Sequence, residues 1–189
     1  MKSISLIMIM TLISLIMIYH VSHRRQYIYK RNILDKKDYD MLCDILKREQ
    51  PDTYSRNWNG LRMKKIMDKR VRRLFHKKVC DTLSNVLSCH LIPSAIPIEY
   101  RVYERGNGMK WHRDTLLHKP AQYEVVYTIW NTSDSKTEYV DHWGITHSVH
   151  TEPNSIMLVR AGGYKHRVLP VEKGKRHILK IAYVPKKDS

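Results

Sequence analysis

The stretch Tyr103–Asp114, YERGNGMKWHRD, decides the fold because a turn joins two extended segments in it. The turn is the Arg-Gly-Asn-Gly run at residues 105–108, and in the segment after it one residue separates His112 from Asp114. On a β-strand, residues i and i+2 point to the same face of the sheet. The stretch therefore predicts one imidazole and one carboxylate that converge from a single strand.

A third ligand for the same metal is predicted at His166, where another extended segment begins after a Gly-Gly turn. Two histidines and one carboxylate on one face of a metal leave three coordination positions open, which suits non-haem Fe(II) chemistry with oxygen. The chain has 11 histidines, so a surface histidine beside a solvated aspartate is the alternative for the His112-x-Asp114 triplet.

A competing metal site consists of His147 and His150, with His142 nearby. Zinc sites built on paired histidines need both rings on one face, and no predicted helix brings this pair together. We therefore place the metal at His112, Asp114 and His166.

Outside these segments, the apolar periodicity changes from helical to strand-like along the chain. Asp35 is a candidate N-cap for a helix to about Lys47, and an apolar stripe at helical spacing runs from about Leu61 to His90. Apolar residues alternate with other residues in two later segments, 98–102 and 125–129, and residues 156–159 and 178–184 are further β-type runs. Helices followed by many short strands predict an α+β domain whose sheet closes into a sandwich or barrel.

The N-terminal segment carries no charge from Ser3 to His23. A bilayer core about 30 Å thick requires about 20 apolar residues in a helix, and the small-residue cleavage site of a signal peptide is missing. We expect a transmembrane anchor over residues 1–23, a basic tether over 24–34, a helical support region over 35–97 and the barrel over 98–185.

Charge predicts the orientation of this single-pass anchor. Lys2 precedes the apolar run, and four basic residues follow it closely: Arg24, Arg25, Lys30 and Arg31. The positive-inside rule then places the C-terminal domain in the cytoplasm. A glycosylation triplet at Asn131 favours a lumenal domain as the alternative.

The net charge of +16 indicates association with an anionic surface. Nine basic residues and one acid lie between Leu61 and Cys80, on the expected basic helix from Arg62 to Lys78. The anionic surface could be membrane lipid, an acidic protein partner or a nucleic-acid backbone.

Four segments together resemble the prolyl-4-hydroxylase-like family of 2-oxoglutarate/Fe(II)-dependent dioxygenases, over about residues 98–184. They are Tyr103–Asp114, Tyr127–Asn131 (YTIWN), Pro153–Val159 (PNSIMLV) and His166–Arg176 (HRVLPVEKGKR). The resemblance implies a double-stranded β-helix, or jelly-roll, barrel. It also implies Fe(II), 2-oxoglutarate and O2 as cofactor and co-substrates, with ascorbate as a candidate reductant.

The same resemblance implies a role for each residue of the site. His112, Asp114 and His166 would hold the iron, and Arg176, ten residues after His166, would bind the far carboxylate of 2-oxoglutarate. An arginine suits that carboxylate because its guanidinium makes paired, planar hydrogen bonds. Tyr103 and Tyr127 would add hydroxyl groups to the co-substrate site, and the alternative for both is a place in the core.

The expected activity is hydroxylation of a protein side chain, in particular a prolyl side chain, with release of succinate and CO2. The basic helix suggests an oxygenase that acts on nucleic acid as one alternative. A non-catalytic binding module on the same barrel is the other, and the complete set of predicted ligands argues against it.

Overall fold

The computed structural model describes residues 7–14, 26–49, 55–56 and 61–186, and two antiparallel sheets dominate it. The major sheet follows a strand order that is far from the order along the chain. It runs β1 (Tyr27–Arg31), β10 (Ser155–Arg160), β7 (Tyr123–Asn131), β12 (Arg176–Pro185), β5 (Glu99–Tyr103), β3 (Arg62–Lys65) and β2 (Ser55–Arg56), with β4 (Leu91–Pro93) also paired to β12.

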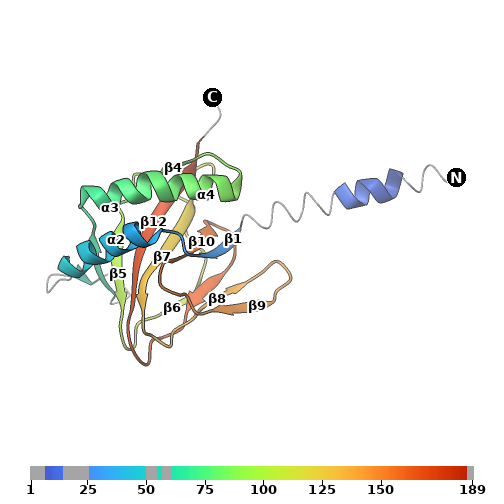
Figure 1. Ribbon diagram of the computed structural model, residues 1–189. Helices are drawn as coiled ribbons and strands as arrows, with labels where there is room; N and C mark the ends of the chain where they lie inside the picture. The colour runs from blue at the N-terminus through green and yellow to red at the C-terminus, as the bar shows by residue number, and fades with distance from the viewer. Residues whose placement is uncertain (1–6, 15–25, 50–54, 57–60, 187–189) are drawn as a thin grey trace.

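The minor sheet supplies the other wall of a jelly-roll-like arrangement (Figure 1). Its order is β6 (Met109–His112), β11 (His166–Val168), β8 (Thr137–Val140) and β9 (Thr146–Val149). The predicted α+β class is therefore confirmed. The two segments with alternating apolar residues form β5 and β7, and the other two β-type runs form β10 and β12.

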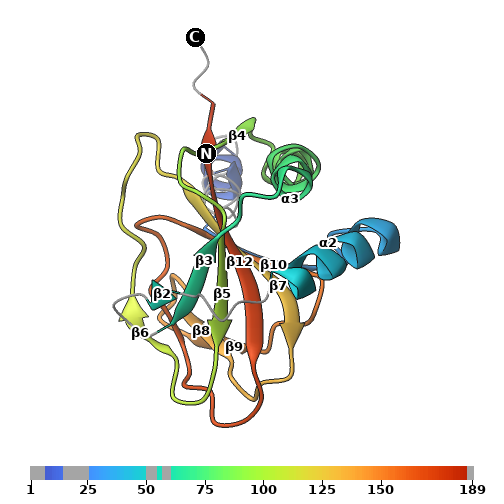
Figure 2. The same ribbon diagram turned by 90° about the vertical axis from the view of Figure 1, so that its left-hand side faces the viewer.

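Four helical elements lie on the side of the major sheet away from the minor sheet (Figures 1 and 2). They are α2 (Lys36–Arg48), α3 (Lys69–Arg73), the π-helix η1 (Leu74–Val79) and α4 (Cys80–Leu87). Asp35 caps α2 as predicted, because its side chain accepts a hydrogen bond from the backbone N–H of Asp38. Leu42 and Leu46 of α2 and Phe75 of η1 are buried in the same apolar core.

The strands of the major sheet have two different faces because their side chains alternate. On β7, Val125, Tyr127 and Ile129 belong to the core beneath the helices. Glu124 and Val126 line the pocket on the other face, between the two sheets. The sheet thus separates a helix-supported core from an interior that can hold ligands.

The prediction of one helical run from Leu61 is wrong over its first residues. Residues 62–65 form β3, which pairs with β5 and extends the major sheet. Helix α3 begins only after Asp68, whose carboxylate accepts hydrogen bonds from the backbone N–H groups of Arg70 and Val71. The expected basic helix from Arg62 to Lys78 is therefore a strand followed by helical segments.

The structure describes part of the expected anchor and part of the basic tether. Within the tether, residues 27–31 form β1, an edge strand that pairs with β10, so this part belongs to the barrel. Of the expected anchor, residues 7–14 are helical and exposed, whereas 1–6 and 15–23 lie outside the described residues. Among the described residues, no helix has both the length and the apolar character needed to cross a bilayer.

Candidate metal centre and its pocket

The three predicted ligands meet at one end of the minor sheet. His112 ends β6, Asp114 lies two residues further on, and His166 begins β11 directly opposite His112. The Nε2 atoms of His112 and His166 lie 3.9 and 3.6 Å from the two carboxylate oxygens of Asp114. One ligand atom from each residue lies within 4.8 Å of the others, and within the described part of the chain no further group of this kind occurs.

Backbone carbonyls orient both imidazoles. His112 Nδ1 lies 2.8 Å from the carbonyl oxygen of Lys110, and His166 Nδ1 lies 3.0 Å from that of Tyr164. Nδ1–H therefore donates in each ring, which leaves the Nε2 lone pair for a metal. Such fixed tautomers are the usual arrangement of metal-binding histidines.

The electrostatics of His166 favour the form that binds metal. Burial lowers the pKa of His166 below its usual value, although the nearby Asp114 carboxylate raises it in part. Neutral imidazole is the ligand form. Two oriented imidazoles and one carboxylate fit the donor set of a non-haem Fe(II) site.

The competing histidines have other partners and do not converge. His147 Nε2 pairs with Asp141 at 2.7 Å, and His150 Nε2–H donates to the carbonyl oxygen of Ser133 at 2.8 Å. His142 Nδ1 contacts the hydroxyl of Tyr164. These contacts are structural links of β8, β9 and their loops.

Arg176 lies in the same pocket as the three ligands. It is 2% exposed, and its Nη1 donates to the hydroxyl of Thr137 at 2.9 Å. Its Nε is buried and has no hydrogen-bond partner among the described residues. A buried guanidinium without a carboxylate is costly unless a ligand supplies the anion, so this site fits one carboxylate of 2-oxoglutarate.

The two predicted tyrosines have different locations. Tyr103 lines the pocket, and its ring lies 5.8 Å from the guanidinium carbon of Arg176. The expectation that Tyr127 lies in the co-substrate site is corrected by the structure. Tyr127 belongs to the core under the helices, and its hydroxyl donates a hydrogen bond to Asn154 Oδ1. On β7, odd-numbered residues point away from the pocket, so Tyr127 cannot contact a ligand held by Arg176.

Several pocket residues escaped the sequence reasoning. Thr137, Arg101, Glu124 and Lys180 all line the cavity, whose volume is about 50 Å³. Strand alternation could have identified two of them, because Lys180 is four residues after Arg176 and Arg101 is two before Tyr103.

Comparison with known proteins supports the fold. No protein-family model and no curated protein matches the sequence. The structure is similar to a Pseudomonas putida prolyl-4-hydroxylase, with a TM-score of 0.67, 12% identity, and coverage of 86% of this chain and 94% of the other.

Two further structures have similar folds. The epimerase SnoN in complex with Fe3+, alpha ketoglutarate and nogalamycin RO matches with a TM-score of 0.70, 11% identity, and coverage of 87% and 82% of the two chains. A Trichoplax adhaerens prolyl hydroxylase in complex with a hypoxia-inducible-factor peptide matches with a TM-score of 0.64, 14% identity, and coverage of 85% and 84%. The chain has the fold of the prolyl 4-hydroxylases and 2-oxoglutarate/Fe(II) oxygenases.

Proposed function

We propose that this protein is an Fe(II)- and 2-oxoglutarate-dependent oxygenase. One observation carries the proposal: the His112, Asp114 and His166 ligand set shares a pocket with Arg176, a buried cation that has no carboxylate partner among the described residues. A metal site alone would suit many proteins. A metal site that shares its pocket with such a guanidinium suits an anionic co-substrate that reaches both.

Each residue has a defined task in this proposal. The two histidines and Asp114 would hold Fe(II) on one face and leave its other positions open toward the pocket. Arg176, oriented by Thr137, would bind the distal carboxylate of 2-oxoglutarate. Val126, Val159 and Ile178 line the cavity and exclude water from it.

The bound metal would supply the oxidative chemistry. For each C–H bond hydroxylated, one 2-oxoglutarate and one O2 are consumed, one oxygen atom enters the product, the other enters succinate, and CO2 leaves. The protein needs no nucleophile or general acid–base pair for this reaction. Its contribution is to bind, orient and shield.

We further propose a protein substrate, in particular a prolyl side chain. The support is the shared fold, together with the peptide that the Trichoplax adhaerens enzyme holds in its complex. Nucleic acid remains the competing substrate, favoured by the net charge of +16.

We also propose that residues 1–23 attach the enzyme to a membrane with its barrel in the cytoplasm. The uncharged run from Ser3 to His23 and the basic residues that follow it support this arrangement. Lys69–Lys78, which includes six basic residues, would then add attraction to anionic lipid.

Succinate formation tests the proposed activity. The chain is incubated with Fe(II), 2-oxoglutarate and O2, alone and with proline-rich peptide, acidic peptide or single-stranded nucleic acid. We expect succinate that requires Fe(II) and increases with a peptide. Absence of succinate under every condition contradicts the oxygenase, and stimulation by nucleic acid alone contradicts the protein substrate.

A further inference from the structure

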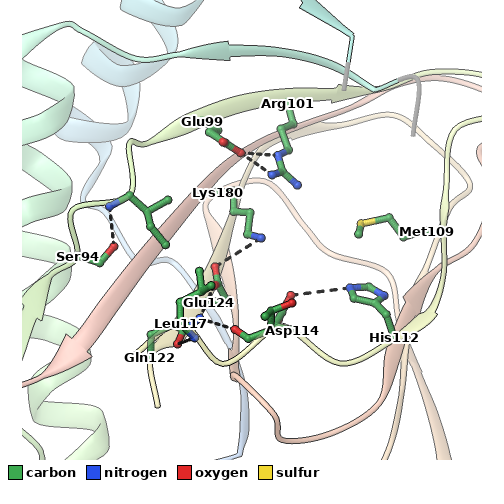
Figure 3. Close-up of polar contacts among 12 residues, drawn as sticks. Ser94, Glu99, Arg101, Met109, His112, Asp114, Leu117, Gln122, Glu124 and Lys180 are labelled. Carbon is green, nitrogen blue, oxygen red and sulfur yellow. Dashed lines mark hydrogen bonds and ion pairs between the residues drawn. The ribbon is translucent and has the colours of Figure 1, made fainter. Parts of the chain in front are cut away.

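A second group of charged side chains lines the pocket that holds the metal ligands and Arg176. Arg101 from β5, Lys180 from β12 and Glu124 from β7 line the same cavity as the three metal ligands. Figure 3 shows the tips of Arg101 and Lys180 directed toward the space in front of Asp114. Neither cation has a task in the proposed binding of iron or 2-oxoglutarate.

Lys180 is largely buried but incompletely paired. Its side chain is 26% exposed, and its Nζ lies 3.5 Å from Glu124 Oε2, which is beyond the usual length of a charge-assisted hydrogen bond. An ammonium group has three N–H donors. No hydrogen bond from Nζ to another described residue satisfies them, so the group can bind a further acceptor in the pocket.

A buried network holds Glu124, the carboxylate beside Lys180, in place. Glu124 Oε1 accepts a hydrogen bond of 3.1 Å from Gln122 Nε2, and the same amide donates to the carbonyl oxygen of Thr115 at 2.8 Å. Gln122 is 0% exposed. Glu124 is thus fixed at the edge of the pocket, 3.5 Å from the lysine Nζ.

Arg101 has one edge occupied and another available. Its Nε and Nη2 both donate to a single oxygen of Glu99, and its side chain is 14% exposed. A guanidinium has five N–H donors in a rigid fork. The remaining donors point to the side of the pocket where Lys180 lies (Figure 3).

Lys180 is separate from the co-substrate site, and Arg101 lies opposite Ile178, between Lys180 and Arg176 along the strands. Arg176 and Lys180 are four residues apart on one strand, so their backbones are about 13 Å apart at a rise of about 3.3 Å per residue. A five-carbon dicarboxylate that spans Arg176 and the metal does not also reach Lys180. The part of the pocket near Lys180 is therefore left for the molecule that is oxidised.

We propose that Lys180 and Arg101 bind a carboxylate of the substrate, close to the C–H bond that reacts. The substrate is then an organic acid, or a peptide with an acidic residue beside its reacting residue. This inference rests on the proposed function, because it assigns 2-oxoglutarate to Arg176 and the second carboxylate to the substrate.

The proposal is tested with pairs of ligands that differ only in a carboxylate or a carboxamide group. They are titrated into the full chain loaded with 2-oxoglutarate and with Mn(II) in place of Fe(II), so that no reaction takes place. Calorimetry compares N-acetylproline with N-acetylprolinamide, and a capped Pro-Glu peptide with its Pro-Gln counterpart. We expect the acid of at least one pair to bind about tenfold more tightly than its amide, as for a hydrogen bond between charged groups. The two pairs distinguish a free acid from an acidic peptide.

Substitutions connect that preference to Lys180. Lys180→Met should remove the difference between acid and amide, and Lys180→Arg should restore most of it. Glu124→Gln keeps the hydrogen bond to Gln122 but removes the competing carboxylate, so it should strengthen binding of the acid. If Lys180→Met does not fold, the double variant Lys180→Met/Glu124→Gln removes both charges together. Lys37→Met, at an exposed position on α2, is the control.

Three results would overturn the proposal. They are equal binding of acids and amides, failure of every acid to bind, and an acid preference that survives Lys180→Met. A Lys180→Met chain that loses 2-oxoglutarate, as Arg176→Leu should, would instead assign Lys180 to the co-substrate. If the wild-type chain binds no 2-oxoglutarate, the proposed function fails, and the same pairs titrated against the Mn(II) chain still decide the subsite.

Discussion

Among single residues, Arg176 links the metal centre most directly to a co-substrate. Replacing it by leucine removes a charge-assisted pair from a buried site, which costs about 2–5 kcal/mol of binding. We expect the KM for 2-oxoglutarate to rise at least about thirtyfold, since 1.4 kcal/mol is a factor of ten. Steady-state succinate formation measures it.

The neighbouring lysines provide the comparison for Arg176. Lys173 and Lys175 are exposed on the turn before β12, and Lys175 pairs with Glu104 at 2.8 Å. Lys173→Ala and Lys175→Ala should leave the KM for 2-oxoglutarate near its wild-type value. If either substitution raises this KM and Arg176→Leu does not, the assignment of the carboxylate site to Arg176 is wrong.

His177 gives the fold a sensitivity to acid. Burial lowers the pKa of His177 to about 4, and its Nδ1 lies 2.7 Å from the hydroxyl of the buried Tyr100. In the unfolded chain the pKa returns to about 6.5. Between these values the unfolded state binds the proton and the folded state does not, so stability falls as the pH drops from about 6.5 toward 4.

The size of that loss can be measured by substitution. We expect His177 to account for roughly 1–2 kcal/mol after allowance for its partial exposure. His177→Gln retains an acceptor for Tyr100 and should flatten the dependence of urea unfolding on pH. His90→Gln, at an exposed position, should leave it unchanged. If the free energy of unfolding changes equally with pH in the wild type and in His177→Gln, this assignment is contradicted.

Among the secondary-structure elements, the turn before β12 determines the position of Arg176, the first residue of that strand. Gly174 has φ +73°, and a Cβ there would lie 2.1 Å from the carbonyl oxygen of Thr132. Gly144 has φ +77°, but nothing lies within 4 Å of its Cβ position. Gly144→Ala should therefore lower stability only by the penalty of placing alanine in the left-handed conformation, about 1–2 kcal/mol.

Gly174→Ala should cost clearly more, because the backbone must also move. The turn is bound to Thr132, the residue that follows β7: the Lys175 N–H donates to Thr132 Oγ1, and the Thr132 N–H donates to the Lys175 carbonyl oxygen. We expect both lower stability and weaker 2-oxoglutarate binding, measured by thermal unfolding with and without the co-substrate. Similar effects of the two alanine substitutions would contradict this role of the turn.

Strands and capped helices were predictable where local pattern and tertiary contacts agree. The β-type run at residues 178–184 lies within strand β12, and Asp35 marks the start of α2. Strand β3 was not predictable, because its basic side chains lie at positions compatible with a helix. Only its pairing with β5 makes this segment a strand. The same limit applies to Tyr127, whose side of the sheet depends on the register of β7 between β10 and β12.

For the whole molecule, membrane attachment remains a prediction from residues 1–31. Full-length protein in sealed microsomes should resist carbonate extraction, and protease added outside should digest the barrel without detergent. Replacing Arg24, Arg25, Lys30 and Arg31 by neutral residues should weaken this orientation. A protected barrel glycosylated at Asn131 would reverse the orientation, and a freely soluble full-length chain would contradict the anchor.

The central claim is that His112, Asp114 and His166 hold the iron of an oxygenase. Anaerobic equilibrium dialysis of the folded chain against Fe(II) tests it most directly. We expect one bound Fe(II) in the wild type and in His147→Ala, and almost none in Asp114→Ala, His112→Ala or His166→Ala, because each removes one of three protein ligands. Retention of iron by these three variants, with loss of iron in His147→Ala, would contradict the account.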